Sequence, residues 1–300
     1  KKDTPSDFMT GYRSVLLKNL VLKHHHSFLR TRCYSLVHSS LHICQTGGIK
    51  GRGTDLSNAC IRWTGFLNKS LNQSSCVFFA DIQSAFYTMI RELVVPLNTS
   101  TVDIEDLIDK IGVPTLFVEP LKLLMQQPSV LDGLIQDKHL LQMLTSSQQF
   151  SWFRVKGSDQ LAHTKTGCGP GDPLADLLYN VALLPAITDI ENTMIRNGLV
   201  HNWPDADFAP FTEAGCVAQQ RLPKEAGTLT AFIDDFSAST PLSLTRDCSN
   251  LVQDISALPL VVSNVMMARG MVLNSKVGKS AIMICLVGQF SRIAKRFMSH

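Results

Sequence analysis

The sequence predicts an α+β fold in which a mostly antiparallel sheet is backed by helices. Short apolar or alternating runs predict strands at residues 76–80, 229–236 and 281–287. Apolar residues at helical spacing predict amphipathic helices between them, most clearly at 54–71 and 244–269. The chain has 300 residues, of which 45% are hydrophobic, so it is long enough to bury a core as one large or two modest domains.

The first clear helix follows a glycine-rich basic loop at 47–53. Residues 10–35 ahead of the loop mix apolar and basic positions without a clear period. Thr54 and Asp55 provide N-cap chemistry for the helix. Its apolar stripe, which we expect to be buried, consists of Leu56, Ala59, Cys60, Trp63, Phe66, Leu67 and Leu71.

The middle of the chain is predicted to be mostly helical. Residues 99–147 have helical character with prolines as punctuation, and 150–155 has the pattern of a strand. A glycine-rich loop at 167–171 then leads to Asp172, which is suited to an N-cap, and to Pro173, which is suited to the first helical position. The pattern therefore predicts a helix that begins directly after this loop.

Prolines and glycines also predict where the later helices stop. Pro185 is expected to kink or end the helix that follows the 167–171 loop. The helix at 244–269 is expected to be interrupted near Pro259 and to end at Gly270. A further short strand is predicted at 271–273.

Charge is modest overall but unevenly distributed. The formal net charge is +3 and charged residues make up 18%, which excludes a polybasic tail that coats DNA non-specifically. No acidic residue follows Asp254, and basic residues gather near both ends of the chain. This asymmetry fits a groove that follows phosphates. Taken alone, such asymmetry is more often a solvated basic face.

The cysteines and histidines indicate no disulfide framework and no zinc site. The eight cysteines are scattered without a CxxC pair, which is typical of reduced, mostly buried thiols in an intracellular protein. The triplet at 24–26 has no cysteine or carboxylate at zinc spacing, so we expect a surface or loop triplet. No apolar run approaches the roughly 18 residues of a membrane span, so no membrane contact is expected. The absence of an initial Met indicates a piece of a longer protein.

Three aspartates form the candidate chemical centre. Asp81 follows the strand at 76–80, ahead of a helix expected over 84–94, while Asp234 and Asp235 lie at the turn of the 229–236 segment. Hard cations such as Mg²⁺ require oxygen ligands, and two or three carboxylates suffice when substrate phosphates complete the coordination. An Asp-Asp turn and an Asp that caps a helix are also common without any function.

Four segments, in this order, resemble the conserved motifs of reverse transcriptases. Residues 79–87 (FADIQSAFY) resemble motif A, and 167–180 (GCGPGDPLADLLYN) resemble motif B. Residues 232–235 (FIDD) resemble motif C, and 270–280, with Asn, Lys and Ser, resemble motif D. Weaker likenesses to fingers motifs lie at 12–16 (YRSVL) and in the 47–55 loop, so the resemblance covers nearly the whole chain. It is closest to the non-LTR retroelement type.

The resemblance implies a polymerase palm-and-fingers architecture with a thumb that is absent or truncated. Residues 1–75 would form fingers, 76–96 a first part of the palm, 97–165 a helical insertion between fingers and palm, and 166–300 the rest of the palm. The implied activity is RNA-directed DNA synthesis with RNA template, DNA primer and dNTPs as partners. The implied cofactor is a pair of Mg²⁺ ions, with Mn²⁺ as a substitute.

The same resemblance assigns roles to single residues. Asp81, Asp234 and Asp235 would be the catalytic metal ligands, helped by the carbonyl of Ile82. The nucleotide-binding set would be Phe86 as the steric gate against a ribose 2′-hydroxyl, Pro170 and Gly171 beside the incoming base, Arg13 on the triphosphate and Lys279 near the leaving phosphates. Arg91 matches an arginine that related retroelements often carry. Pro170 departs from the Gln of many relatives, which puts that contact in doubt.

Two alternatives remain at the level of sequence. One is an inactive retroelement remnant that retains only the palm fold or nucleic-acid binding, and the other is a helical interaction protein in which the aspartates merely cap turns. A P-loop ending at Ser280 is excluded, because GxxxxGK[ST] needs a glycine where Leu273 stands. Nothing in the sequence indicates the oligomeric state.

Overall fold

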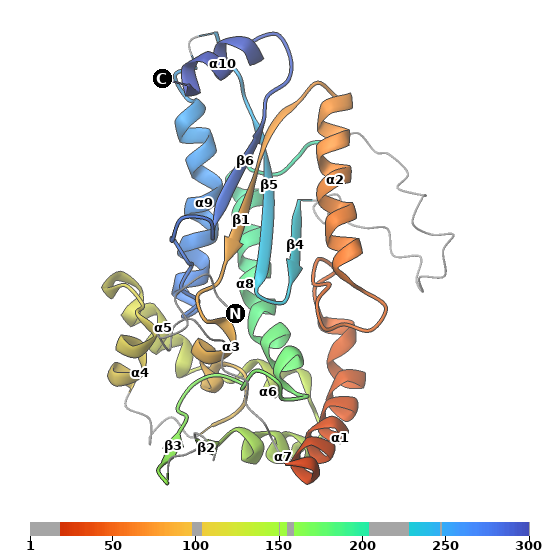
Figure 1. Ribbon diagram of the computed structural model, residues 1–300, viewed down its shortest axis with the longest axis vertical. Helices are drawn as coiled ribbons and strands as arrows, with labels where there is room; N and C mark the ends of the chain where they lie inside the picture. Colours follow the sequence, from red (N-terminus) through yellow and green to blue (C-terminus); the bar gives the residue numbers. More distant parts are fainter. Residues whose placement is uncertain are drawn as a thin grey trace.

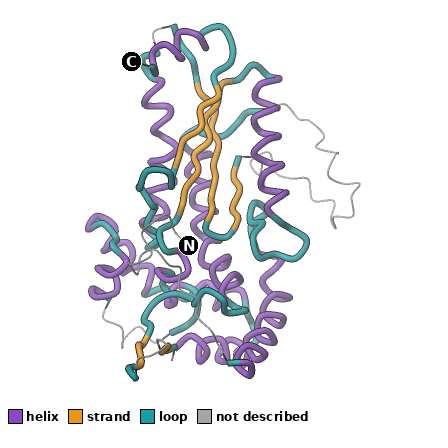
Figure 2. The backbone as a smooth tube through the Cα atoms, in the orientation of Figure 1, coloured by secondary structure: helices purple, strands orange, loops and turns teal. Residues whose placement is uncertain are grey.

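A four-stranded antiparallel sheet forms the centre of the protein (Figure 1). The computed structural model describes residues 19–97, 104–149, 151–154, 159–203, 228–246 and 248–299. The strand order is β4-β5-β1-β6, with bounds β1 Ser74–Asp81, β4 Leu229–Phe232, β5 Asp235–Leu242 and β6 Ala281–Cys285. Helices surround the sheet (Figure 2), so the predicted α+β class with an antiparallel sheet is confirmed.

Strand β1 sets the register of the sheet. It pairs with β5 along its whole length, from Ser74 opposite Leu242 to Asp81 opposite Asp235. On its other side it pairs with β6, which is an edge strand. Because side chains alternate along a strand, the buried residues Cys76, Phe78 and Ala80 face the core, and Asp81 lies at the end of the strand.

Two long helices cover one face of this sheet (Figure 1). They are α8 (Ala175–Arg196) and α9 (Leu251–Ala268), which pack on each other and share one hydrophobic core with β1 and β5. Helix α2 (Thr54–Ser70) packs against β4 and also contacts β1. This arrangement leaves the carboxyl end of β1 and the β4–β5 turn together at one end of the sheet.

Shorter elements form the part of the molecule beyond that end (Figure 1). Helix α1 (Leu20–Val37) packs on α7, and η2 (His38–Ser40) continues it. The others are α3 (Ala85–Thr88), η3 (Arg91–Leu93), α4 (Ile104–Ile111), η5 (Thr115–Phe117), α5 (Val118–Met125), α6 (Val130–Leu134), α7 (Lys138–Gln149), β2 (Trp152–Arg154) and β3 (Leu161–His163). Helix α10 (Ser291–Met298) lies at the opposite end of the molecule. The helical character predicted for 99–147 and the strand predicted near 150–155 are confirmed within the described residues.

Neither proline ends its helix, so the expected interruption near Pro259 is wrong, and of the two outcomes expected at Pro185 an end of the helix is excluded. Helix α8 continues through Pro185 and α9 continues through Pro259. A proline inside a helix costs about 3 kcal/mol or more. Each large apolar side chain that a helix buries contributes about 1.5–3 kcal/mol, and α8 buries Ala186, Ile187 and Ile190 directly beyond its proline. The packing therefore outweighs the lost backbone hydrogen bond.

Three other local predictions need correction. The helix expected over 84–94 is only α3 followed by η3, because Met89 and Ile90 leave the helical conformation with ψ 125° and 110°. The strand expected at 271–273 is a single bridge between Ile82 and Leu273. Helix α9 begins at Leu251 rather than at 244.

The buried face of α2 is polar instead of apolar. Its buried residues are Ser57, Thr64 and Asn68, while Phe66 from the predicted stripe is 63% exposed. The polar face is used for hydrogen bonds, since the Oδ1 atom of Asn68 accepts from the indole of Trp203 at 2.9 Å. The helix itself is confirmed, although its N-cap is Gly53 and not Thr54.

The prediction about apolar runs also needs correction. Within the described part of the chain, α9 is long and apolar enough to cross a membrane, judged by length and composition alone. One line of its side chains, Leu251, Leu258, Val262 and Met266, is buried in the protein core. A core helix passes the same test of length and composition, so α9 by itself does not distinguish the two settings.

Candidate active site

Two of the three predicted aspartates face each other across neighbouring strands. Asp81 at the end of β1 is the direct partner of Asp235 at the start of β5. Asp234 lies next to them in the two-residue turn between β4 and β5. The structure thus places Asp81 and Asp235, which are more than 150 positions apart in the sequence, directly opposite each other on neighbouring strands.

The turn that carries Asp234 has an unusual backbone. Ile233, the first residue of the turn, has φ +58°, in the left-handed region that β-branched residues rarely adopt. A positive φ at the first central position is typical of type II′ hairpin turns, where glycine is the preferred residue. Such strain persists only where the surroundings fix the backbone.

The glycine-rich loop at 47–53 packs against this turn and fixes its backbone. A Cβ atom on Gly47 would lie 2.5 Å from the backbone nitrogen of Ile233, so only glycine fits against the turn. The preceding residues form hydrogen bonds with β4: Thr46 donates its N–H to the Ala231 carbonyl at 2.7 Å, and Ala231 donates to the Cys44 carbonyl at 2.9 Å. The loop therefore supports the Asp234–Asp235 turn from the side.

Residues after α9 hold Asp81 in place. The side-chain amide of Asn274 donates to Asp81 Oδ2 at 2.8 Å, and its backbone N–H donates to the Asp81 carbonyl at 2.8 Å. The Asp81 N–H donates to Ser280 Oγ at 3.2 Å. Lys279 places its Nζ 3.8 Å from Asp81 Oδ2. The 270–280 segment, predicted from resemblance alone, therefore meets the first aspartate directly.

The local electrostatics favour a cation at this place. The pKa of Asp235 is raised, first by partial burial and second by the nearby Asp81 carboxylate, while Lys279 acts in the opposite direction. Burial, followed by the charge of Asp234, raises the pKa of the Tyr179 hydroxyl well above its usual value, so this phenol stays protonated. Like charges that disfavour each other's ionised form are neutralised when a cation binds between them.

The three aspartates have the right chemistry to bind metal ions, but their side chains are not arranged around one point. Asp81, Asp234 and Asp235 supply the oxygen ligands that Mg²⁺ prefers. Within the described residues, no three or more His, Cys, Asp or Glu side chains are already grouped around one point as a metal site. Ile82 is buried and bridges to Leu273. The hydrogen bonds of this bridge are made by its two neighbours: the Asp81 carbonyl accepts from the Asn274 N–H, and the Gln83 N–H donates to the Val272 carbonyl. The ligand role of the Ile82 carbonyl stays a prediction.

Phe86, five residues after Asp81, lies against α8. Its ring packs on Tyr179 with the centroids 5.3 Å apart, and its carbonyl accepts from the Cys168 N–H at 2.9 Å. Gly167 makes this contact possible, because a Cβ there would lie 2.4 Å from the Phe86 carbonyl oxygen. The loop before α8 thus fixes the position of the Phe86 backbone.

Pro170 and Gly171 form a tight turn in that loop. The Asp172 N–H donates to the Gly169 carbonyl at 3.1 Å, and Gly171 has φ +92°. Proline followed by a glycine of positive φ is the preferred pair of a type II turn. This turn accounts locally for proline at position 170. Helix α8 begins at Ala175 with Leu174 as its N-cap, so the prediction of Asp172 as N-cap and Pro173 as first helical residue is wrong. Asp172 instead accepts from the Leu174 N–H at 2.9 Å, ahead of the helix.

A buried histidine anchors the same loop. His26 Nδ1 lies 2.8 Å and 2.9 Å from the two carboxylate oxygens of Asp172, and both residues are buried. The prediction of a surface triplet is therefore wrong for His26, while His24 and His25 are exposed. The signal was in the sequence, since the buried residues of α1, namely His26, Leu29, Cys33 and Val37, follow helical spacing.

Arg91 is a second anchor of the loop. It is 4% exposed and donates to the carbonyls of Gly167, Gln148, Thr164 and Thr166 and to the Thr164 hydroxyl. A guanidinium that forms five hydrogen bonds inside the protein is a structural element. Arg91 thus joins the segment after β1 to the loop before α8.

Among the remaining predictions, Arg13 lies outside the described residues. An arginine that the sequence analysis did not single out as a site residue does lie near the glycine loop. Arg30 donates to the Gly48 carbonyl at 3.1 Å and to Asp176 Oδ2 at 2.6 Å. The seven described cysteines are free, and most are buried, as predicted.

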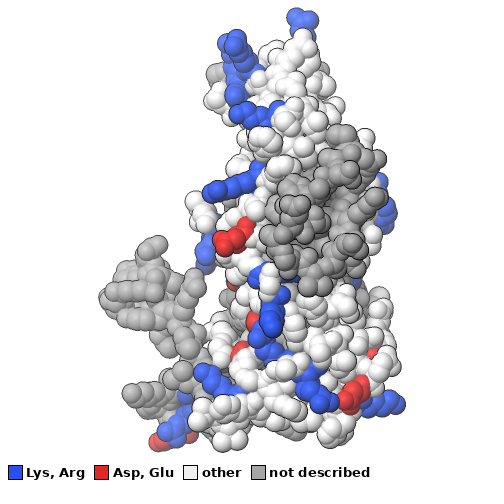
Figure 3. Space-filling model, turned by 90° about the vertical axis from the view of Figure 1, so that its right-hand side faces the viewer, with Lys and Arg blue, Asp and Glu red and all other residues white. Residues whose placement is uncertain are grey.

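The surface shows an excess of basic side chains on one side. On the face turned to the viewer in Figure 3, Lys and Arg form a broken band along the length of the molecule, with few Asp or Glu among them. A band of this kind provides local attraction for polyanions even when the net charge is only +3.

Comparisons with known proteins give fold-level matches only. No protein-family model and no curated protein matches the sequence. Several solved structures are similar in arrangement, and two of them are described here by their identity and coverage. One is a telomerase from Candida albicans in complex with the TWJ fragment of telomeric RNA, with 11% identity and a TM-score of 0.44, over 90% of this chain and 35% of that chain. The other is an apo telomerase from Candida tropicalis truncated from the C-terminal domain, with 13% identity and a TM-score of 0.42, over 91% of this chain and 45% of that one. The chain thus spans less than half of either protein.

Proposed function

We propose that this chain is the palm and fingers part of an RNA-directed DNA polymerase of the non-LTR retroelement type. The observation that carries the proposal is the pairing of Asp81 with Asp235 across β1 and β5, with Asp234 in the adjoining turn. Carboxylates at the end of a rigid sheet are what two-metal nucleotidyl transfer requires. The fingers, palm and insertion boundaries follow from the same proposal.

The residues that would hold two Mg²⁺ or Mn²⁺ ions are Asp81, Asp234 and Asp235, with the Ile82 carbonyl as a further ligand. Such ions, when bound, lower the pKa of the primer 3′-hydroxyl and neutralise the departing pyrophosphate. Asn274 orients the Asp81 carboxylate for this role through its hydrogen bond to Oδ2.

The chain's own side chains select and position the nucleotide. Phe86, fixed between Gly167 and Tyr179, is the steric gate that rejects a ribose 2′-hydroxyl and so favours dNTPs. Lys279, whose Nζ is 3.8 Å from Asp81 Oδ2, would protonate the leaving phosphate, and its closeness to a proposed metal ligand supports this role. Pro170 and Gly171 provide a backbone turn beside the base, and Arg13 is the proposed contact to the triphosphate.

RNA template and DNA primer are the proposed partners. The basic band on the surface supports binding through phosphates, with affinity that falls as salt rises. The free, mostly buried thiols support an intracellular location.

The test is primer extension by the purified chain on poly(rA)/oligo(dT) with Mg²⁺ or Mn²⁺. We expect extension by the wild type and none by Asp81→Asn or Asp234→Asn, because each variant lacks one ionised ligand. Asp109→Asn, a change at an exposed aspartate of α4, is the matched control and should remain active. Full extension by either site variant with an intact circular dichroism spectrum would refute the ligand assignment.

A second candidate is an inactive remnant that retains the fold and nucleic-acid binding. It is favoured by the lack, within the described residues, of three acidic or metal-binding side chains already grouped as a metal site. It predicts salt-dependent binding of the primer–template without extension under either metal. The primer-extension assay combined with a binding assay on the same substrate therefore separates the two candidates.

A further inference from the structure

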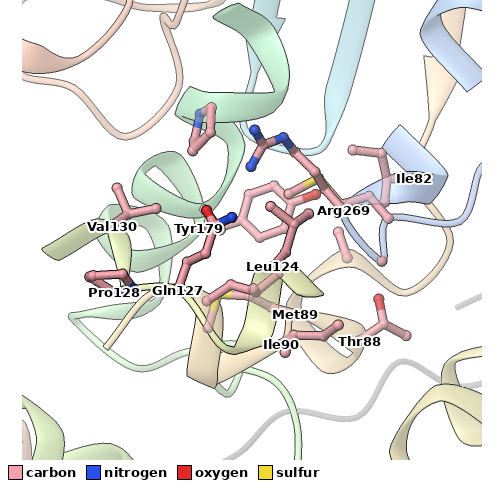
Figure 4. Close-up of a pocket in the computed structure, with 16 residues that line it drawn as sticks. Ile82, Thr88, Met89, Ile90, Leu124, Gln127, Pro128, Val130, Tyr179 and Arg269 are labelled. Carbon is pink, nitrogen blue, oxygen red and sulfur yellow. The ribbon is translucent and has the colours of Figure 1, made fainter. Parts of the chain in front are cut away.

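Helix α8 has two different faces near the candidate active site. On one face, Tyr179, Ala182 and Pro185 line a mostly apolar cavity of about 240 Å³ (Figure 4). Asn180 is not among the residues that line this cavity. It is 1% exposed, and its side chain is directed to the glycine-rich loop at 47–53 instead. A buried amide needs hydrogen-bond partners, because an unpaired polar group inside a protein costs free energy.

The Asn180 side chain finds a partner for each of its polar atoms. Its Nδ2 donates to the Gly47 carbonyl at 2.8 Å and to the Asp176 carbonyl at 2.9 Å. Its Oδ1 accepts from Gln45 Nε2 at 3.3 Å. The two backbone carbonyls can only accept, so they determine which atom of this amide is the nitrogen.

Gln45 is the second amide of the network, and it is fully buried. Its Nε2 also donates to the backbone carbonyl of Asn180 at 2.8 Å, and its Oε1 accepts from the His42 N–H at 2.9 Å. Its backbone forms a parallel bridge with Ala231 of β4. The two amides therefore connect α8, β4 and the glycine-rich loop, and a network with every polar atom paired makes this part of the core rigid.

Gly47 is the point at which the network reaches the turn between β4 and β5. A Cβ on Gly47 would lie 2.5 Å from the Ile233 backbone nitrogen, so the two backbones are in contact. Ile233 has φ +58°, which a β-branched residue keeps only under constraint, and Asp234 is the next residue. Because Asn180 holds the Gly47 carbonyl, it also holds the backbone that constrains this turn.

We propose that Asn180 and Gln45 are positioning residues for Asp234. They act on it through the contact between Gly47 and Ile233, which sets the direction in which the turn presents its carboxylate. Neither amide is one of the proposed metal ligands or nucleotide contacts. The consequence for metal binding rests on the proposed function, whereas the support of the turn is a property of the fold and is measured without any activity.

Hydrogen exchange of the full chain, followed by mass spectrometry, tests the support of the turn. Asn180→Ala removes the donor to the Gly47 carbonyl, so the amides of 232–236 should exchange about tenfold faster or more. The amides of 281–285 should exchange as in the wild type, because β6 is the edge strand on the other side of β1. An effect confined to the turn distinguishes positioning from a general loss of stability.

Binding of Mn²⁺, measured by the electron paramagnetic resonance of the free ion, tests the consequence for the site. Asn180→Ala should weaken it by about 10–100-fold, as is typical when a group that orients a metal ligand is removed. In primer extension it should lower kcat and leave the KM for poly(rA)/oligo(dT) unchanged, since neither amide contacts the substrate.

Gln45→Met is the second variant, and it decides the question if Asn180→Ala does not fold. It keeps a side chain of similar volume and the backbone bridge to β4, and it removes the side-chain hydrogen bonds. Exchange at the turn and Mn²⁺ binding should change in the same direction as in Asn180→Ala. The losses in the double variant should be less than additive, because both residues act in one network.

Asn68→Ala is the matched control. Asn68 is as buried as Asn180 and accepts from the Trp203 indole, but it lies just ahead of β1, where its carbonyl accepts from the Gln73 N–H at 2.8 Å. The Asp234 turn lies at the other end of the sheet, beside the end of β1. Asn68→Ala should therefore leave the exchange of the turn and the binding of Mn²⁺ unchanged, even where it lowers overall stability.

Two results overturn the positioning role, whether or not the wild type extends primers. One is unchanged exchange of the turn in folded Asn180→Ala and Gln45→Met. The other is faster exchange spread evenly over the chain, because the amides would then only stabilise the fold. A wild type that neither binds Mn²⁺ nor extends primers refutes the proposed function instead, and the exchange of the turn still decides whether the two amides hold it.

Discussion

Asn274 holds Asp81 at two atoms, through its side-chain amide on Oδ2 and through its backbone N–H on the carbonyl, each at 2.8 Å. The backbone bond fixes the position of the chain, and the side-chain bond fixes the rotation of the carboxylate. Two residues separated by 193 positions in the sequence therefore determine the direction in which the first aspartate presents its oxygens.

The first prediction concerns this amide. Asn274→Ala keeps the backbone bond and removes the side-chain donor, so the Asp81 carboxylate is free to rotate. Loss of such a partner typically lowers metal affinity or activity by about 10–100-fold. Primer-extension rates measured against Mg²⁺ concentration check it. Lys276→Ala, in the same loop, should have little effect, and an unchanged rate and Mg²⁺ dependence in Asn274→Ala would remove Asn274 from this role.

The Asp81–Asn274 contact also shows which parts of the site the sequence could predict and which it could not. Asp81 after a strand and the Asp-Asp turn are local patterns, so composition and turn chemistry were sufficient to predict them. Their meeting depends on the order β4-β5-β1-β6, which no local pattern encodes. Asn274 was named within a resembling segment, but its contact with Asp81 depends on the path of the chain after α9.

Several failures have the same physical origin. His26 belongs to a helical stripe, yet its burial depends on Asp172, 146 positions away. Ser84 and Ile233 adopt positive φ values that their own side chains disfavour, so only tertiary contacts account for them. Helix α8 continues through Pro185 because buried side chains on both sides of it compensate. Each failure marks a place where long-range packing overrides local preference.

The second prediction concerns sugar selection. Phe86→Val shortens the side chain that packs on Tyr179 and opens space beside the proposed nucleotide. Ribonucleotide incorporation relative to dNTPs should rise at least tenfold, since the 2′-hydroxyl no longer meets a ring. Single-nucleotide extension with rNTP and dNTP pairs measures the ratio. Tyr87→Val, at the adjacent and 40% exposed position, is the control. An unchanged ratio in Phe86→Val would exclude the gate role.

The third prediction separates backbone strain from steric conflict at Gly167. Gly112 and Gly167 have nearly the same φ, +78° and +81°, but a Cβ on Gly112 meets nothing within 4 Å. Gly112→Ala should cost about 1–2 kcal/mol of unfolding free energy, which is the price of the left-handed conformation alone. Gly167→Ala should cost about 1–3 kcal/mol more, because its Cβ overlaps the Phe86 carbonyl. Urea denaturation measures both, and equal losses would contradict the packing of this loop.

The fourth prediction concerns acid stability and His201. This side chain is buried, its Nε2 lies 2.8 Å from Ser239 Oγ, and its Nδ1 has no hydrogen-bond partner within the described residues. Burial lowers the pKa of His201 from 6.5 to about 4. The unfolded chain therefore takes up the proton first as pH falls, so the contribution is fully present above pH 6.5 and is lost between 6.5 and about 4.

The expected loss for the wild type from His201 is about 2 kcal/mol at pH 5. His201→Gln has no titrating ring and should lose less stability between pH 7.5 and pH 5 than the wild type does, by about that amount. His163→Gln changes an exposed histidine of β3 and should retain the wild-type pH dependence. Urea denaturation of the three proteins at the two pH values provides the comparison. If His201→Gln loses as much as the wild type, the neutral buried imidazole is not a source of the acid sensitivity, because its protonation would then cost the folded state nothing.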